Sequence, residues 1–170
     1  MIYLFEVTSS EIPDFKRLIQ LNSSDTFENL HRILQKTSNF DQSQMASFYL
    51  SDDHWKKKIE ISSLDSGGFS AQHLSMQKIK LNDYVSAVGE KLIYVFDFFN
   101  ERFFYLELKE KFMKTDLKEP FVAYEKGNAP AQLLVNKNEN HDVDLLESDD
   151  TYKSFGELED YYEIFGEMDA

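Results

Sequence analysis

Apolar and polar residues alternate along the first part of the chain, and this alternation predicts two strands. Residues 2–7 place Tyr3, Phe5 and Val7 on one face of an extended segment. Residues 15–21 alternate in the same way, and the serines and the proline between the two stretches are typical of a turn. We therefore expect the chain to begin with a pair of half-buried strands.

The apolar period then changes from two residues to three and four, which predicts the main helix. Its apolar stripe recurs at helical spacing and consists of Phe27, Leu30, Ile33 and Leu34. Asp25 can cap the first turn, and Glu28 three residues later can complete a capping box. We expect this helix to span residues 25–37.

Shorter apolar runs predict the other strands of the domain. Strands are expected at residues 47–50, 55–61 and 121–124. The intervening residues 62–75 are rich in serine and glycine, which predicts a surface loop.

A short second helix is predicted at residues 82–88. Asn82 is a suitable cap, Val85 and Val88 fall on one face, and Gly89 stands where helices commonly end. This helix separates the earlier strand pairs from an aromatic hairpin.

The hairpin lies within residues 94–108, where seven of fifteen residues are aromatic. A two-residue connection at Asn100 and Glu101 would pair Asp97 with Phe104 and leave Arg102 as the diagonal neighbour of Asp97 on the same apolar face. A carboxylate on such a face costs several kcal/mol unless it is paired. We therefore predict an ion pair between Asp97 and Arg102.

Strands thus occur in pairs and do not alternate singly with helices. This order predicts an α+β fold with a mixed, largely antiparallel sheet, one main helix, a short second helix and an acidic C-terminal helix. We assign residues 1–135 to one α+β domain and residues 136–170 to an acidic tail.

Charge separates these two parts further. The formal net charge of the chain is -13, and residues 138–170 carry twelve acids and one lysine, which leaves a net of -2 on residues 1–137. An acidic chain repels a phosphate backbone, so the composition argues against nucleic-acid binding.

The tail contains a predicted amphipathic helix at about residues 154–166. Its apolar face, which we expect to bind a partner, consists of Phe155, Leu158, Tyr162 and Phe165. Two roles fit this helix, docking on its own domain or entering the groove of a partner protein. Its acidic opposite face argues against binding to anionic membranes.

The composition also bears on the compartment. The chain contains no cysteine, which fits a reducing environment. Glu6 interrupts the first apolar run, and no apolar run approaches the roughly 18 residues of a membrane-spanning helix. We expect a cytoplasmic protein that enters no membrane.

Residues 136–147 space their oxygen-bearing side chains in the manner of a calcium loop. Asn136 stands at the first ligand position, however, and His141 replaces the glycine that the turn of such a loop requires. We therefore expect no metal site, and nothing in the sequence implies a cofactor.

Several short motifs together resemble the plasmid ORF-3-like family, also named TnpR-type proteins of transposons. They are the pair Leu30-His31, the pair Phe40-Asp41, LNDYV at 81–85 and YVFDF at 94–98. The resemblance covers residues 1–110 and implies a fold more than a reaction. The family commonly continues the last motif with Gly-Asp and then a tryptophan, for which this chain has Phe99, Asn100 and Arg102.

A recombinase activity, which the second family name suggests, is disfavoured. Serine recombination needs a nucleophilic serine surrounded by arginines that stabilise the transferring phosphate. The chain has only three arginines, which are Arg17, Arg32 and Arg102.

The sequence leaves three functions open. The first is a non-catalytic domain that binds a partner protein through the aromatic sheet, the acidic tail or both. The second is an enzyme or small-ligand binder with a cleft formed by His31, Asp41, Asp97 and Arg102, although His31, at the border of the helix stripe, also fits a packed histidine. The third is an accessory protein of mobile DNA, as the family name implies.

Overall fold

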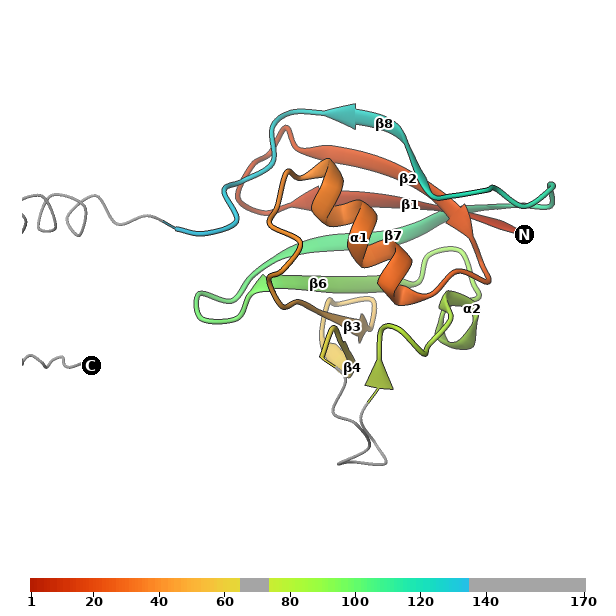
Figure 1. The fold of residues 1–170 in the computed structure, drawn as a ribbon, viewed down its shortest axis with the longest axis horizontal. Coiled ribbons are helices and arrows are strands. Elements are labelled where there is room, and N and C mark those ends of the chain that lie inside the picture. Colours follow the sequence, from red (N-terminus) through yellow and green to blue (C-terminus); the bar gives the residue numbers. More distant parts are fainter. Residues whose placement is uncertain (65–73, 135–170) are drawn as a thin grey trace, which may run out of the picture. The chain divides into compact units, whose positions relative to one another are not determined.

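The computed structural model describes residues 1–64 and 74–134, and one compact unit spans Met1–Gln132. Its described strands form one sheet in the order β5-β4-β3-β6-β7-β1-β2-β8 (Figure 1). The strands are β1 (Ile2–Ser9), β2 (Lys16–Asn22), β3 (Ser47–Ser51), β4 (Lys57–Ser62), β5 (Leu74–Ser75), β6 (Lys91–Asp97), β7 (Arg102–Phe112) and β8 (Phe121–Lys126). The helices are α1 (Phe27–Thr37) and α2 (Leu81–Tyr84).

This arrangement confirms the predicted α+β fold. Every described strand pair is antiparallel except β4 with β5, so the sheet is mixed and largely antiparallel. The predicted C-terminal helix lies outside the described residues. Within residues 1–64 and 74–134, neither helix has the length and apolar character needed to span a membrane.

The core lies between α1 and one face of the sheet. The predicted stripe of α1 is buried, with Phe27, Leu30 and Leu34 fully enclosed. At the centre of the sheet, the ring of Phe104 stacks on Phe15 at 4.9 Å and on Phe40 at 5.8 Å between centroids. Aromatic packing of this kind accounts for the burial of large side chains in a domain with a single main helix.

The N-cap of α1 lies one residue later in the chain than predicted. Thr26 is the N-cap, and its hydroxyl accepts from the Asn29 N–H at 3.2 Å while the Asn29 side chain accepts from the Thr26 N–H at 2.9 Å. The predicted Asp25–Glu28 capping box was wrong because the Asp25 carboxylate accepts from the Asn22 N–H at 2.9 Å. Asp25 therefore closes the turn after β2.

The second helix is shorter than predicted. It spans Leu81–Tyr84 instead of residues 82–88, and Val85 is buried while Val88 is 56% exposed. The helix stops because the Glu90 carboxylate accepts from the N–H groups of the next turn, at 3.0 and 2.6 Å, and holds that turn outside the helix.

The aromatic hairpin has a different register from the predicted one. Asp97 lies opposite Arg102, and Tyr94 lies opposite Phe104, so four residues form the turn. The turn is closed by Asp97, which accepts from the N–H and the side-chain amide of Asn100 at 3.1 and 2.9 Å. Glu101 in this turn has a φ of 53°. The predicted contact nevertheless forms, because Arg102 Nη1 lies 3.4 Å from Asp97 Oδ2.

Candidate functional site

Arg102 is the centre of a buried hydrogen-bond network. Its Nε and Nη2 donate to the two carboxylate oxygens of Glu11 at 2.9 and 3.0 Å. Nη1 donates to Asp97 at 3.4 Å and to the Gln132 carbonyl at 3.0 Å, and Nη2 also donates to the Ala131 carbonyl. All five N–H groups of the guanidinium therefore have acceptors within the protein, which leaves none for a ligand.

Two of the predicted acidic residues meet this network, Asp97 through its carboxylate and Asp41 through its backbone. Burial raises the pKa of Asp97, but hydrogen bonds from Asn100 and Arg102 outweigh it and hold the pKa below the ordinary value. Asp41 joins through Gln132, whose side-chain oxygen accepts from the Asp41 N–H at 2.7 Å. The network thus ties the segment after β8 to the β6–β7 turn and does not form a cleft.

His31 lies apart from the other three candidate residues. Its side chain is buried, and its Nδ1 lies 2.8 Å from the hydroxyl of Tyr94. Burial, with a smaller contribution from Arg32, lowers the pKa of His31 to about 4, and burial raises the pKa of Tyr94. The neutral imidazole is therefore packed in the core between α1 and β6.

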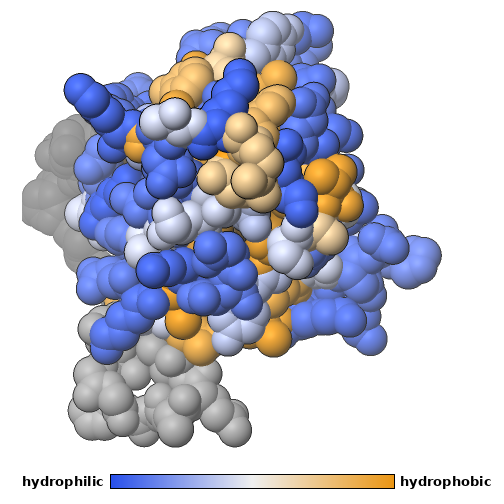
Figure 2. All heavy atoms as spheres, turned by 90° about the vertical axis from the view of Figure 1, so that its right-hand side faces the viewer, coloured by the Kyte–Doolittle hydropathy of each residue, from blue (hydrophilic) through white to orange (hydrophobic). Residues whose placement is uncertain are grey.

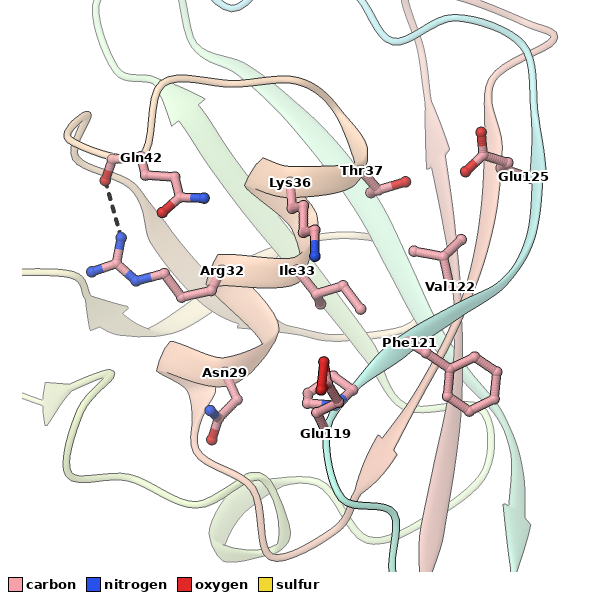
Figure 3. Close-up of a pocket in the computed structure, with 11 residues that line it drawn as sticks. Asn29, Arg32, Ile33, Lys36, Thr37, Gln42, Glu119, Phe121, Val122 and Glu125 are labelled. Carbon is pink, nitrogen blue, oxygen red and sulfur yellow. Dashed lines mark hydrogen bonds between the residues drawn. The ribbon is translucent and has the colours of Figure 1, made fainter.

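A groove with different lining residues runs between α1 and β8. This α1–β8 groove has a volume of about 550 Å³, and none of the four predicted cleft residues lines it (Figure 3). Ile33 of α1 and Phe121 and Val122 of β8 supply its apolar surface. Val122 faces α1 because it pairs across the strands with Ile19, which belongs to the core.

The two rims of the groove carry opposite charges. Arg32 and Lys36 lie on the helix rim, and Glu119 and Glu125 lie on the strand rim. Arg32 is engaged, because it donates to the carbonyl of Gln42 at 3.1 Å and forms an ion pair with the preceding turn of α1. Among the described residues Lys36 has no ion-pair partner, so its ammonium is available to a ligand.

The strand that borders the groove is an edge strand. In the described part of the sheet, β8 pairs with β2 only, so the outer side of its backbone has no strand partner. Phe121 and Tyr124 on this strand are 42% and 47% exposed. An exposed edge with large apolar side chains is a template for pairing with another chain.

A second, more polar pocket adjoins the groove. This Arg17 pocket has a volume of about 410 Å³ and lies where α1 and β8 end, beside residues 128–132. Thr37 and Glu125 line both the groove and the pocket. Arg17 is buried, donates from Nε to the Thr37 hydroxyl at 3.0 Å, and packs its guanidinium over the ring of Phe15 at 4.4 Å.

A third hollow, of about 750 Å³, lies between the chain start and the β7–β8 connection. Its apolar contributors include Ile2, Met113 and Leu117. On the side shown in Figure 2 the hydrophobic areas are broken up by hydrophilic side chains. This hollow has neither an unpaired strand edge nor a buried charged residue in its lining, so the groove and the Arg17 pocket are the stronger candidates for a functional site.

Sequence reasoning singled out neither the groove nor the Arg17 pocket. Arg17 offered a signal, because it shares a strand face with Phe15, Ile19 and Leu21, where an arginine is unusual. The groove offered none, because it depends on which strand lies at the edge of the sheet.

Comparisons with known proteins give a family and a fold but no reaction. No curated protein matches the chain. A crystal structure of a protein of unknown function from Methanosarcina mazei Go1 is similar with a TM-score of 0.58 and 19% identity, over 86% of this chain and 81% of that one. This likeness concerns the fold alone. The sequence pattern of the plasmid pRiA4b ORF-3-like proteins matches residues 2–133. The chain therefore belongs to the plasmid pRiA4b ORF-3-like protein family.

Proposed function

We propose that this domain binds an extended segment of a partner protein in the α1–β8 groove, where the segment adds a strand to β8. The observation that carries the proposal is the position of the groove beside the open edge of the sheet. An added strand gains backbone hydrogen bonds from the edge, and side chains on its inner face enter the groove. A chain without cysteine suits such a role in the cytoplasm.

The lining residues indicate which segment would fit. Ile33 and Val122 favour apolar side chains facing the domain. Lys36 favours an acidic side chain on the helix side, whereas Glu119 favours a basic one on the strand side. The predicted partner-binding residues of the tail lie outside the described residues and remain a separate prediction.

The test is selection of ten-residue peptides on the full chain, followed by calorimetry with synthetic versions of the selected sequences. We expect micromolar dissociation constants. A Val122→Arg substitution should weaken binding at least tenfold, because it fills the groove with a charge. The matched control is Tyr124→Arg on the same strand, which does not line the groove and should change binding less than twofold.

Two further measurements test the mode of binding. Peptides with N-methyl groups at alternate backbone positions should bind at least tenfold more weakly in one of the two registers, because a strand pair needs those N–H groups. Failure to select any peptide would overturn the proposal. So would a stable dimer that Val122→Arg dissociates, because a second copy of the chain would then occupy the edge.

A further inference from the structure

The Arg17 pocket lies at one end of the α1–β8 groove. Asn29 and Glu119 line the groove near the start of α1 and β8, whereas Thr37 and Glu125 line it near the end of both elements, as Figure 3 shows. The last two residues also line the Arg17 pocket. A segment that follows the groove in the direction of β8 therefore arrives at this pocket.

Arg17 has unused hydrogen-bond donors at this point. Its Nε donates to Thr37, and its Nη1 lies 2.9, 2.9 and 3.0 Å from the carbonyls of Lys16, Lys126 and Gly127. Nη2 has no hydrogen-bond acceptor among residues 1–64 and 74–134. This nitrogen is also not fully enclosed by the protein. Since Arg17 lines the pocket, the two N–H groups of Nη2 are the donors that this residue can offer to a ligand there, although the residue is only 4% exposed.

Ser38 supplies a second unused donor in the same pocket. The residue is 5% exposed, and within the described chain its hydroxyl is buried without a hydrogen-bond partner. A buried hydroxyl without a partner destabilises the protein, so a ligand that accepts a hydrogen bond from it gains affinity. Arg17 Nη2 offers two donors and a positive charge to an acceptor with two oxygens, and the enclosed Ser38 hydroxyl adds a third hydrogen bond once its side chain rotates toward the ligand.

Two negative groups near the pocket, Glu125 and the C-terminal end of α1, would repel a bound anion, but both are weaker than the attraction of Arg17. Glu125 lies across from Arg17 in the β2–β8 pair and interacts with it electrostatically, but it forms no ion pair with Arg17 and is exposed, so solvent screens its charge. At the C-terminal end of α1, the carbonyls of the last turn already accept from the N–H groups of Ser38, Asn39 and Phe40. The buried cation therefore decides the preference of the pocket.

We propose that the Arg17 pocket binds the free C-terminal carboxylate of the peptide that occupies the α1–β8 groove. This inference rests on the proposed function. It adds the class of partner, which is a protein whose last residues are accessible. It also adds a direction, because a peptide that ends in this pocket runs parallel to β8.

The primary test compares one selected peptide as the free acid and as the C-terminal amide, by calorimetry on the full chain. We expect the amide to bind at least tenfold more weakly. Arg17→Met should remove most of the difference between the two forms. Ser38→Ala, which leaves Arg17 in place, should reduce it about threefold and serves if the arginine variant does not fold.

Controls separate this inference from the proposed function. Arg32→Met on the groove rim should weaken acid and amide equally. Equal binding of acid and amide to the unaltered chain would overturn the terminal carboxylate and leave the groove intact, whereas absence of binding by both forms would overturn both proposals. Sodium acetate at millimolar concentration tests whether the pocket binds a small free carboxylate. If acetate binds while the free-acid and amide peptides bind with equal affinity, the pocket binds a separate small ligand and the inference is overturned.

The direction has its own measurement. A paramagnetic label on the N-terminus of the peptide should broaden amide signals near Glu119 and spare those near Asn128. The reverse pattern would place the C-terminus at the other end of the groove and overturn the inference.

Discussion

Arg102 and Arg17 occupy similar positions and differ in how they are neutralised. Both are buried, and both donate to carbonyls at the end of β8 or just after it, at Ala131 and Gln132 for Arg102 and at Lys126 and Gly127 for Arg17. Arg102 also binds two carboxylates, whereas Arg17 binds none among the described residues.

Because of this difference, we assign the charge of Arg102 a structural role and regard the charge of Arg17 as available to a ligand. A buried ion needs an opposite charge and a full set of hydrogen bonds to offset its lost hydration. Arg102 has both, and its substitution should therefore act on stability. Arg17 has acceptors for part of its guanidinium and no carboxylate, and its substitution should act mainly on binding. The following experiments test this division.

Substitution of Arg102 by Met should have the largest effect. It leaves Asp97 and Glu11 without their partner, and removal of one member of a buried ion pair costs about 3 kcal/mol. The measurement is urea denaturation, with Arg32→Met as the control for an exposed arginine. A loss of less than about 0.5 kcal/mol would show that the pair does not hold the hairpin.

Acidification should lower the stability of the protein through His31, whose buried imidazole is neutral in the folded state. Its pKa is about 4 in the folded protein and ordinarily 6.5, so between these values the unfolded chain binds the additional proton. Stability is therefore fully present above pH 6.5 and falls as the pH is lowered, by about 3 kcal/mol at pH 4.

The control for this effect is His31→Asn, which keeps a polar atom near Tyr94 but does not titrate. Urea denaturation of this variant should show a much flatter dependence between pH 6.5 and pH 4. An unchanged slope would place the pH dependence on other groups and contradict the assignment to His31.

Substitution of Arg17 by Met should cost less stability than that of Arg102. The carbonyls of Lys126 and Gly127 lose a donor, but no carboxylate is left without its partner. We expect about 1.5 kcal/mol by urea denaturation. A cost equal to that of Arg102→Met would contradict the division between the two arginines.

The smallest expected effect concerns the turn that positions Arg102. Glu101 has a φ of 53°, a conformation that favours glycine. Glu101→Gly should therefore stabilise the protein by about 0.5 kcal/mol in thermal or urea denaturation, after the entropy cost of glycine is subtracted. A destabilising effect would show that the glutamate side chain contributes more than its backbone strain costs.

Local patterns predicted the elements that local interactions determine. The alternation in β1 and β2 and the stripe of α1 depend on residues a few positions apart, and these elements form as expected. The hairpin register was missed because the Asp97 side chain bonds to Asn100 and enlarges the turn. The contact between Asp97 and Arg102 still forms, because the two residues now lie directly opposite each other.

The candidate site was not predictable from such patterns. The groove exists because β8 pairs with β2, about 100 residues earlier in the chain, and the sequence predicted β8 as a strand without its neighbour. The predicted cleft grouped polar residues by type. Asp41, Asp97 and Arg102 do meet in one network, but that network is fully hydrogen-bonded around Arg102, and His31 is in the core.

The central pairing of the sheet has a consequence for the synthesis of the protein. Ile2 in β1 pairs with Phe112 in β7, so the first strand waits for a partner that leaves the ribosome about 100 residues later. At about 5–20 residues per second this delay lasts roughly 5–20 s. During that time the β1–β2 hairpin presents Phe5 and Val7 without their final cover, so the sheet can close around its central strand only after β7 has been synthesised.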